Sequence, residues 1–219
     1  RYSGINLPLI AMTNTDVILK IKISNINKLI RKPKLTQAVL HTKPILKLTA
    51  NYIYLDDTER KLFAEARHEY IIEQVLSNGN VNLEKAKQRI NLKFGRNCVK
   101  ELIWVFEYNK DLSIADISDY SVNGINPINR TKITINTKSI VDQNGIYFNY
   151  VVPYEKYKSS PSEGINVFKF GLECMGYQPS GTLNFSILDD AEMLVTLNSS
   201  SLNLENKHIR IFASSYNIL

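Results

Sequence analysis

Alternation of apolar and polar residues with a period of two is the sequence feature that most constrains the fold of this chain. In residues 17–24, apolar side chains occupy every second position, with Lys20 and Lys22 between them. Successive side chains of a β-strand point to opposite faces, so this pattern is typical of a strand with one face on the core and one in water. The alternation predicts four further strands of this kind, at residues 90–94, 168–170, 182–187 and 209–211.

Two other segments have the composition of buried strands. Residues 102–106 are apolar on both sides of Trp104, which predicts a central strand that is covered on both faces. Residues 146–152 combine aromatic with β-branched side chains, which are enriched in strands, and are predicted to form another.

Only one segment is predicted to be clearly helical, residues 56–67. It begins with Asp56 and Glu59 at the spacing of a capping box, and its apolar residues Leu62, Phe63 and Ala66 share one stripe. Residues 83–87 could form a second, shorter helix, but their pattern is ambiguous.

Three segments lack periodicity and carry turn residues: 25–44, 109–130 and 155–164. They are too long for tight hairpins and are predicted to be excursions from a compact sheet structure. About ten short strands without strand–helix alternation favour an all-β fold, an antiparallel β-sandwich or jelly roll with one short helix and long loops. Because no internal repeat or low-complexity linker is visible, residues 1–219 are predicted to form a single domain.

Composition excludes several classes of protein. Hydrophobic residues make up 44% and charged residues 22% of the chain, which disfavours disorder, and no apolar stretch is long enough to cross a membrane as a helix. The net charge of +6 is spread out, and the densest basic run is only Arg31-Lys32-Pro33-Lys34, so a solvated loop is favoured over direct nucleic-acid binding. The chain starts at Arg1 without a leader sequence, which suggests a piece of something longer.

The residues that usually carry catalysis are not in catalytic patterns. His68-Glu69 begins like a zinc-protease motif, but Ile72 stands where the second histidine is required, so a structural His68 at a helix–strand junction is favoured. No phosphate-binding loop and no nucleophile elbow occur, and Asp56-Asp57 and Asp189-Asp190 are typical of caps or turns. With only Cys98 and Cys174, neither a disulfide framework nor a four-cysteine zinc site is possible. The sequence predicts no enzyme, no cofactor, no metal site and no small-molecule substrate.

Two surface functions stay open at this point. Tyrosines cluster between Tyr147 and Tyr157 and could stack on sugars, although a half-buried edge of the sandwich is favoured. N-glycosylation patterns occur at Asn129, Asn184 and Asn198, of which Asn184 falls inside a predicted strand.

Seven segments, taken in order, resemble a known family. They are LPLIAM (7–12), YIYLDDTERKLFAEARHEYIIEQ (52–74), INLKFGRNCVKELIWVFE (90–107), YFNYVVPYEKY (147–157), GINVFKFGLE (164–173), YQPSGTLNFSILDDAEMLVTL (177–197) and IRIFASSYNIL (209–219). In this order they resemble the C-terminal half of the major capsid proteins of nucleocytoplasmic large DNA viruses. Two departures are visible: Arg96-Asn97-Cys98-Val99 replaces a frequent Asn-His-Pro-Val, and Glu155-Lys156-Tyr157 replaces a frequent Gln-His-His.

The resemblance implies a structural role. Members of this family have two consecutive jelly rolls per chain, and three chains form a pseudo-hexagonal capsomer of an icosahedral shell, so residues 1–219 would be the second jelly roll. Loops 25–44 and 109–130 would project outward or lock neighbouring subunits. The signature residues would be structural: Leu102, Trp104 and Phe106 in the core, Pro153 at the end of a strand, and Pro179, Ser180 and Gly181 at the turn that leads to Asn184, Phe185 and Ser186.

The implied partners are other shell components: two further copies in a homotrimer, neighbouring capsomers and minor capsid proteins, with an inner membrane possible nearby. The implied location is the virion capsid, assembled in the host cell cytoplasm. A protein that forms a scaffold on immature membranes, as in poxviruses, has the same fold. The net charge of the chain does not distinguish such a scaffold protein from a capsid protein. A glycan- or receptor-binding β-sandwich on a virion surface is the alternative from another functional class.

Overall fold

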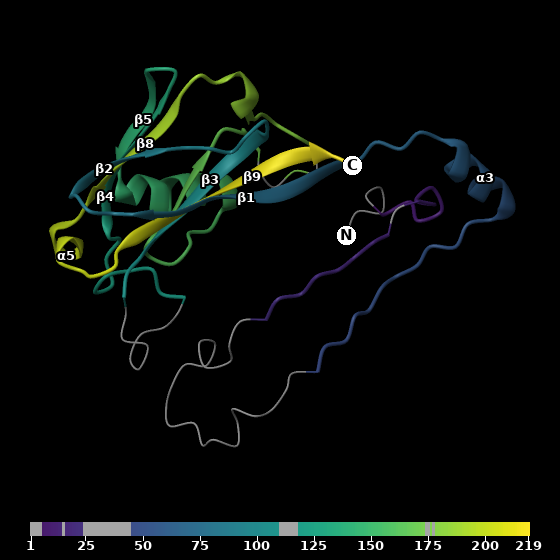
Figure 1. The fold of residues 1–219 in the computed structure, drawn as a ribbon, viewed down its shortest axis with the longest axis horizontal. Helices are drawn as coiled ribbons and strands as arrows, with labels where there is room; N and C mark the ends of the chain where they lie inside the picture. Colours follow the sequence, from purple (N-terminus) through teal and green to yellow (C-terminus); the bar gives the residue numbers. More distant parts are fainter. Residues whose placement is uncertain (1–5, 15, 24–44, 110–117, 174–175, 177) are drawn as a thin grey trace. The chain divides into compact units, whose positions relative to one another are not determined.

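The computed structural model describes residues 6–14, 16–23, 45–109, 118–173, 176 and 178–219. The chain divides into two compact units, one of residues 1–71 with 218–219 and one of residues 72–217. Among the described residues before Ile71, helix α3 (Asp57–Glu65) is the one regular element of the first unit. The β-sandwich begins with the strand that starts at Ile71 (Figure 1).

The sandwich consists of two β-sheets (Figure 1). One sheet has the strand order β1 (Ile71–Asn82), β9 (His208–Ile218), β3 (Cys98–Glu107) and β6 (Ile165–Lys169), and the two-residue β7 (Leu183–Asn184) also pairs with β3. The other sheet has the order β2 (Lys87–Asn91), β8 (Ala191–Leu197), β4 (Ile128–Ile135) and β5 (Lys138–Asn144).

This strand order is that of a jelly roll. If the eight longer strands are lettered B to I along the chain, the sheets are B-I-D-G and C-H-E-F, so that successive strands mostly alternate between the sheets. Every pairing whose register is described is antiparallel. The predicted fold class, an antiparallel jelly-roll sandwich, is confirmed.

The core lies between the two sheets. Trp104 on β3 is completely buried and stands opposite Ile211 of β9 and Asn166 of β6. From the other sheet, alternate residues point inward, as the burial pattern of β8 shows for Ala191, Met193, Val195 and Leu197. The predicted central strand around Trp104 is therefore confirmed, because β3 has neighbours on both edges and buried residues on both faces.

The predicted helix is also present, with both hydrogen bonds of a capping box. Asp56 accepts from the amide N–H of Glu59 (2.8 Å), and the Glu59 carboxylate accepts from the amide N–H of Asp56. No residue of α3 is buried, so the apolar stripe at Leu62 and Phe63 faces solvent within the described residues. Residues 83–87 form no helix: Leu83 is a buried residue of the connection after β1, and Lys87 begins β2.

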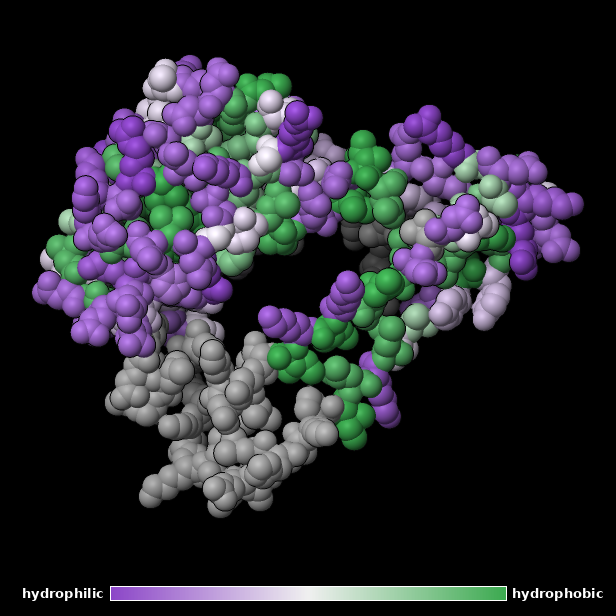
Figure 2. Space-filling model, viewed as in Figure 1, coloured by the Kyte–Doolittle hydropathy of each residue, from purple (hydrophilic) through white to green (hydrophobic). Residues whose placement is uncertain are grey.

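Residues 17–23 do not form the predicted strand. Val17, Leu19 and Ile21 are each more than half exposed, and no backbone ladder joins this segment to a described strand. The alternation shows that the segment can form a strand, but a strand also needs a neighbour that accepts and donates its hydrogen bonds. Figure 2 shows uncovered hydrophobic residues along the first unit, where residues 45–54 have a similar apolar character.

Residues 146–152 are helical instead of extended, and this prediction was wrong. Here η2 (Tyr147–Val151) is one turn of π-helix that continues into α4 (Val152–Tyr157). The buried side chains of Phe148 and Val152 are four residues apart, which is the spacing of one helix face. Pro153 lies in the first turn of α4, where its missing N–H costs nothing, and does not end a strand.

The segment 182–187 is a strand only in part. β7 covers Leu183 and Asn184, and Phe185–Ile187 form a turn of 3₁₀-helix, η3. The Asn184 side chain accepts from the amide N–H of Ser186 (2.9 Å), which favours this local turn over an extended backbone. Phe185 remains buried, whereas Ile187 is exposed.

A glycine fixes the loop that enters β6. Gly164 has φ +91°, and a Cβ atom there would lie 2.2 Å from the carbonyl oxygen of Tyr120. We expect Gly164→Ala to cost about 2 kcal/mol more than Gly124→Ala, since Gly124 shares the positive φ (+74°) but has open space around it. Urea unfolding of both variants measures the difference, and equal stabilities would contradict the close approach.

Candidate assembly surface

The connection between β5 and β6 leaves one sheet and enters the other through η2 and α4. Its start is fixed by Asn144, whose side-chain oxygen accepts from the amide N–H of Tyr147 (3.0 Å). Its end is Lys158, in the left-handed conformation (φ 61°), whose amide N–H donates to the carbonyl oxygen of Tyr154. We call residues 146–157 the helical excursion.

The inner side of the helical excursion is anchored in the core. The Phe148 side chain is completely buried, and its ring meets that of Trp104 edge-on at 5.2 Å. The buried amide of Asn149 donates to the carbonyl oxygens of Ser162 and Ile165 (3.1 and 2.8 Å). These contacts hold the excursion against the sandwich as a rigid element.

A buried ion pair forms a second anchor. Glu101 of β3 and Lys169 of β6 stand directly opposite each other, with Oε2 and Nζ 3.3 Å apart, and the Lys169 side chain has no exposed surface. The Tyr157 hydroxyl donates to the same carboxylate oxygen, and the Lys169 ammonium lies 3.1 Å from the centre of the Tyr157 ring. Tyr157 therefore covers the pair and ties the end of α4 to the sheet.

Lys169 is the main residue that the sequence placed wrongly. Its position between Phe168 and Phe170 predicts a solvent-facing side chain, but Tyr157 closes over it. The alternation predicts on which face of the sheet a strand residue lies. It does not predict whether a segment from elsewhere in the chain covers that face. Tyr157 also lies too deep to serve as the open sugar-stacking platform considered for the tyrosine cluster.

A third charged contact reinforces the same sheet near its edge. Lys100 Nζ lies 2.6 Å from Oε1 of Glu73 on β1 and 5.5 Å from the centre of the Tyr216 ring. Burial alone would lower the pKa of Lys100, but the hydrogen bond and negative charge of Glu73 outweigh it and raise the pKa above its ordinary value. Lys100 thus stays charged while its side chain is almost fully buried.

The outer side of the helical excursion is apolar and exposed. Ile146, Tyr150 and Tyr154 follow one another at intervals of four residues and are 67%, 51% and 53% exposed. The rings of Tyr150 and Tyr154 stack with centres 5.7 Å apart, and Val151 lies beside them, 43% exposed. Aromatic side chains on a rigid support are typical of protein contact surfaces. We call these four residues the tyrosine face.

The signature residues of β3 fill the core: Leu102, Trp104 and Phe106 have no exposed surface. The turn at Pro179-Ser180-Gly181 lies at the surface, where the Ser180 hydroxyl accepts from the amide N–H of Glu173 (2.8 Å) and donates to its carbonyl oxygen.

Further along, the Asn184 side chain accepts from the Ser186 hydroxyl (2.7 Å), and Phe185 packs edge-on against Phe94. The β3 residues thus lie in the core, whereas most of the later motif shapes surface turns.

The remaining candidates have structural surroundings. His68 contacts the carbonyl oxygen of Phe63 through Nε2 (2.7 Å), and His208 contacts Glu107 (3.1 Å). Of the two N-glycosylation patterns outside the predicted strands, Asn198 has a side-chain nitrogen that donates a hydrogen bond to the carbonyl oxygen of Asn126 (2.6 Å). The side chain of Asn129 is exposed. His41, Cys174 and the basic run 31–34 lie outside the described residues, as does the whole of loop 25–44.

The described residues contain neither a cluster of metal-binding side chains nor a membrane-spanning helix. No group of three His, Cys, Asp or Glu side chains in that part of the chain could hold a metal ion. None of its helices has the length and apolar character needed to span a membrane.

A family model described as "Large eukaryotic DNA virus major capsid protein" matches residues 59–219, which include the whole sandwich. The chain belongs to this family. Among curated major capsid proteins, that of Pyramimonas orientalis virus is 30% identical over all of this chain and 56% of its own length. That of Paramecium bursaria Chlorella virus 1 is 28% identical over 91% of this chain and 53% of its own length.

Solved structures of capsid proteins have the same fold as this chain. The capsid protein VP54 of PBCV-1 superimposes with a TM-score of 0.64 at 25% identity, over 77% of this chain and 52% of that one. The Faustovirus major capsid protein superimposes with a TM-score of 0.65 at 9% identity, over 76% of this chain and 36% of that one, which shows the fold alone. The chain thus spans about half the length of the curated relatives that it matches.

Proposed function

We propose that this chain is part of a structural subunit of the icosahedral capsid of a large DNA virus, and that it has no catalytic role. One observation carries the proposal: the family match at residues 59–219 coincides with a complete eight-stranded jelly roll whose fold recurs in solved capsid proteins. In this proposal the sandwich is the second of two jelly rolls in the whole protein. Three copies form a pseudo-hexagonal capsomer, which assembles in the host cytoplasm with neighbouring capsomers and minor capsid proteins.

In this proposal the tyrosine face is one surface through which copies contact each other. It is apolar, it contains two stacked tyrosines, and its support is fixed by Phe148 and by the buried Glu101–Lys169 pair. A rigid surface loses little conformational entropy on association, so more of its burial energy contributes to affinity.

The proposed capsid function is tested by purifying the natural protein that contains this sequence and measuring whether it assembles. Under reducing conditions we expect light scattering to give a trimer, and electron microscopy to show hexagonal capsomers. A protein that stays monomeric at high concentration would contradict the proposal.

The tyrosine face is tested in the same protein with Tyr150→Ser/Tyr154→Ser. Since both side chains are half exposed, we expect the melting temperature to fall by only about 2–4 °C. We expect assembly only at about tenfold higher concentration or more, the effect of losing about 1.4 kcal/mol of contact energy. Ile125→Ser/Ile140→Ser removes two exposed apolar side chains elsewhere on the sandwich and serves as the matched control. Equal assembly of the two double variants would exclude the tyrosine face as a contact.

A further inference from the structure

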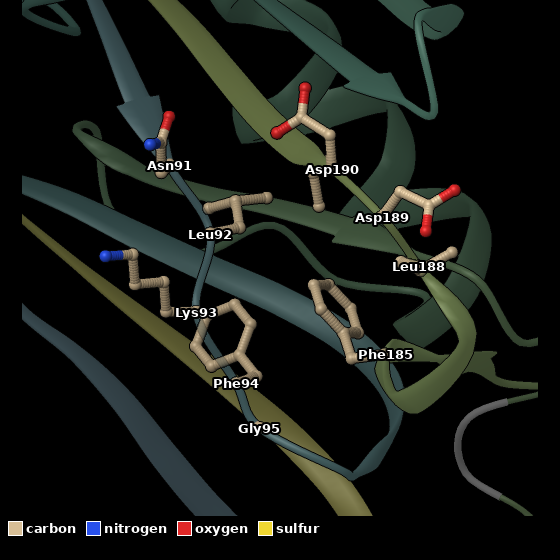
Figure 3. Close-up of a pocket in the computed structure, with 10 residues that line it drawn as sticks. Asn91, Leu92, Lys93, Phe94, Gly95, Phe185, Leu188, Asp189 and Asp190 are labelled. Carbon is tan, nitrogen blue, oxygen red and sulfur yellow. The ribbon is translucent and has the colours of Figure 1, made fainter.

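A groove lies between two connections of the sandwich, residues 91–95 after β2 and residues 185–191 before β8 (Figure 3). Its volume is about 400 Å³, and it opens to solvent. The groove is closed at one end by the hydrogen bond from the Leu92 amide to the carbonyl oxygen of Ala191 (2.8 Å), which continues the β2–β8 ladder. None of the residues that line the groove belongs to the tyrosine face.

The floor of the groove is apolar. The rings of Phe94 and Phe185 meet edge-on at 5.4 Å, and both side chains are nearly buried. Leu92 and Leu188 contribute further apolar walls, as Figure 3 shows. Such a floor suits aliphatic or aromatic side chains of a ligand.

The rim of the groove is acidic. Asp189 and Asp190 are exposed, and neither carboxylate has an ion-pair partner among the residues that the structure describes. In Figure 3, Asp190 and Asn91 stand on opposite sides of the opening, and Lys93 extends away from it. This arrangement favours a cation at the rim and disfavours nucleic acid or an anionic lipid surface.

Both walls are held in place by asparagine side chains. Asn78 donates to the carbonyl oxygen of Asn91 (3.1 Å) and accepts from the amide N–H of Lys93 (2.6 Å). Asn136 accepts from the amide N–H groups of both Asp189 and Asp190 (3.0 and 3.1 Å). The groove is therefore formed before any ligand binds, which lowers the entropic cost of binding.

The groove and the helical excursion lie at opposite ends of the four-stranded sheet. β4 pairs antiparallel with both β5 and β8, so β5 and β8 run in the same direction. The groove lies where β8 begins, whereas the helical excursion follows the end of β5. A copy bound at the tyrosine face would thus leave the groove accessible.

We propose that this groove binds an extended peptide segment of another shell protein, in which Lys or Arg stands next to aliphatic residues. The aliphatic side chains would lie on Phe94 and Phe185, and the basic side chain would meet Asp189 and Asp190. The identification of the partner as a shell protein rests on the proposed capsid function, whereas the peptide chemistry rests on the groove alone.

Peptide titration of the isolated chain, followed by amide NMR shifts, tests the proposal without requiring assembly. The probe is a five-residue peptide in which Arg and Lys alternate with Leu, Ile and Val, and the control peptide has Glu in place of both basic residues. We expect only the basic peptide to shift residues 91–95 and 185–191. In Asp189→Asn/Asp190→Asn we expect affinity to fall about fivefold, which corresponds to about 1 kcal/mol from two exposed charge contacts.

A matched charge control is Glu84→Gln/Glu163→Gln, which removes two exposed carboxylates outside the groove and should leave affinity within about twofold of the unaltered chain. No shift at millimolar peptide, equal binding of the acidic peptide, or undiminished affinity of Asp189→Asn/Asp190→Asn would each overturn the groove proposal. None of these outcomes affects the capsid proposal, which the assembly experiment tests separately.

Discussion

Trp104→Ala is expected to lower the free energy of unfolding by about 3–5 kcal/mol, as is usual when a large core aromatic is truncated. The Trp104 side chain is completely buried in the central strand β3, and it supports Phe148 and hence the helical excursion. Its removal leaves a cavity at the point where the two sheets and the excursion meet. Urea unfolding followed by circular dichroism measures the loss.

Two variants make this result interpretable. Trp104→Phe keeps most of the apolar volume, and its expected cost is below about 1.5 kcal/mol because the Trp104 indole N–H has no hydrogen-bond partner among the described residues. Tyr150→Ala truncates a half-exposed aromatic ring, with an expected change of about 0.5 kcal/mol. A loss below about 1 kcal/mol for Trp104→Ala would place Trp104 outside the core.

Glu101→Gln is expected to cost about 3 kcal/mol, because it leaves the Lys169 ammonium buried without its counter-charge. By contrast, Glu101→Leu/Lys169→Met removes both charges and should be close to neutral, since an apolar pair of similar size can replace a buried ion pair. Arg130→Gln breaks an exposed pair with Asp142 and should cost less than about 1 kcal/mol. The comparison of the three unfolding curves separates burial from charge pairing.

A double variant as unstable as Glu101→Gln would contradict this account of the pair. It would mean that packing around Tyr157 and not the uncompensated charge carries the cost. Thermal unfolding at neutral pH is sufficient to compare the variants.

The local patterns of the sequence predicted what depends on local physics. The period-two alternation located the end of β2, the end of β6, the short β7 and the beginning of β9, because alternate residues of most of these segments are buried. It did not locate β8, although β8 has the same pattern of burial. The capping residues located α3, since Asp56 and Glu59 satisfy backbone N–H groups within a single turn. The resemblance to capsid proteins added the jelly-roll topology, which the alternation alone does not contain.

The failures have a common physical cause, which is that neighbours distant in sequence decide the outcome. Residues 146–152 have strand-like composition, but the groups that contact Phe148 and Asn149 come from β3, from β6 and from the loop before β6. The alternation at 17–23 marks a possible strand, and pairing decides whether it forms. The groove could not be predicted, because Phe94 and Phe185 are 91 positions apart and meet only in the folded sheet.

The position of β9 has a consequence for how the protein is made. β9 is the last strand of this sandwich along the chain, yet it lies inside the B-I-D-G sheet between β1 and β3. Until the ribosome has released it, β1 and β3 lack their shared neighbour, and their open edges can pair with other nascent chains. Such long-range pairing folds slowly, so we expect cotranslational folding to stall before β9 and expect the yield of native protein to depend on chaperones that shield those edges.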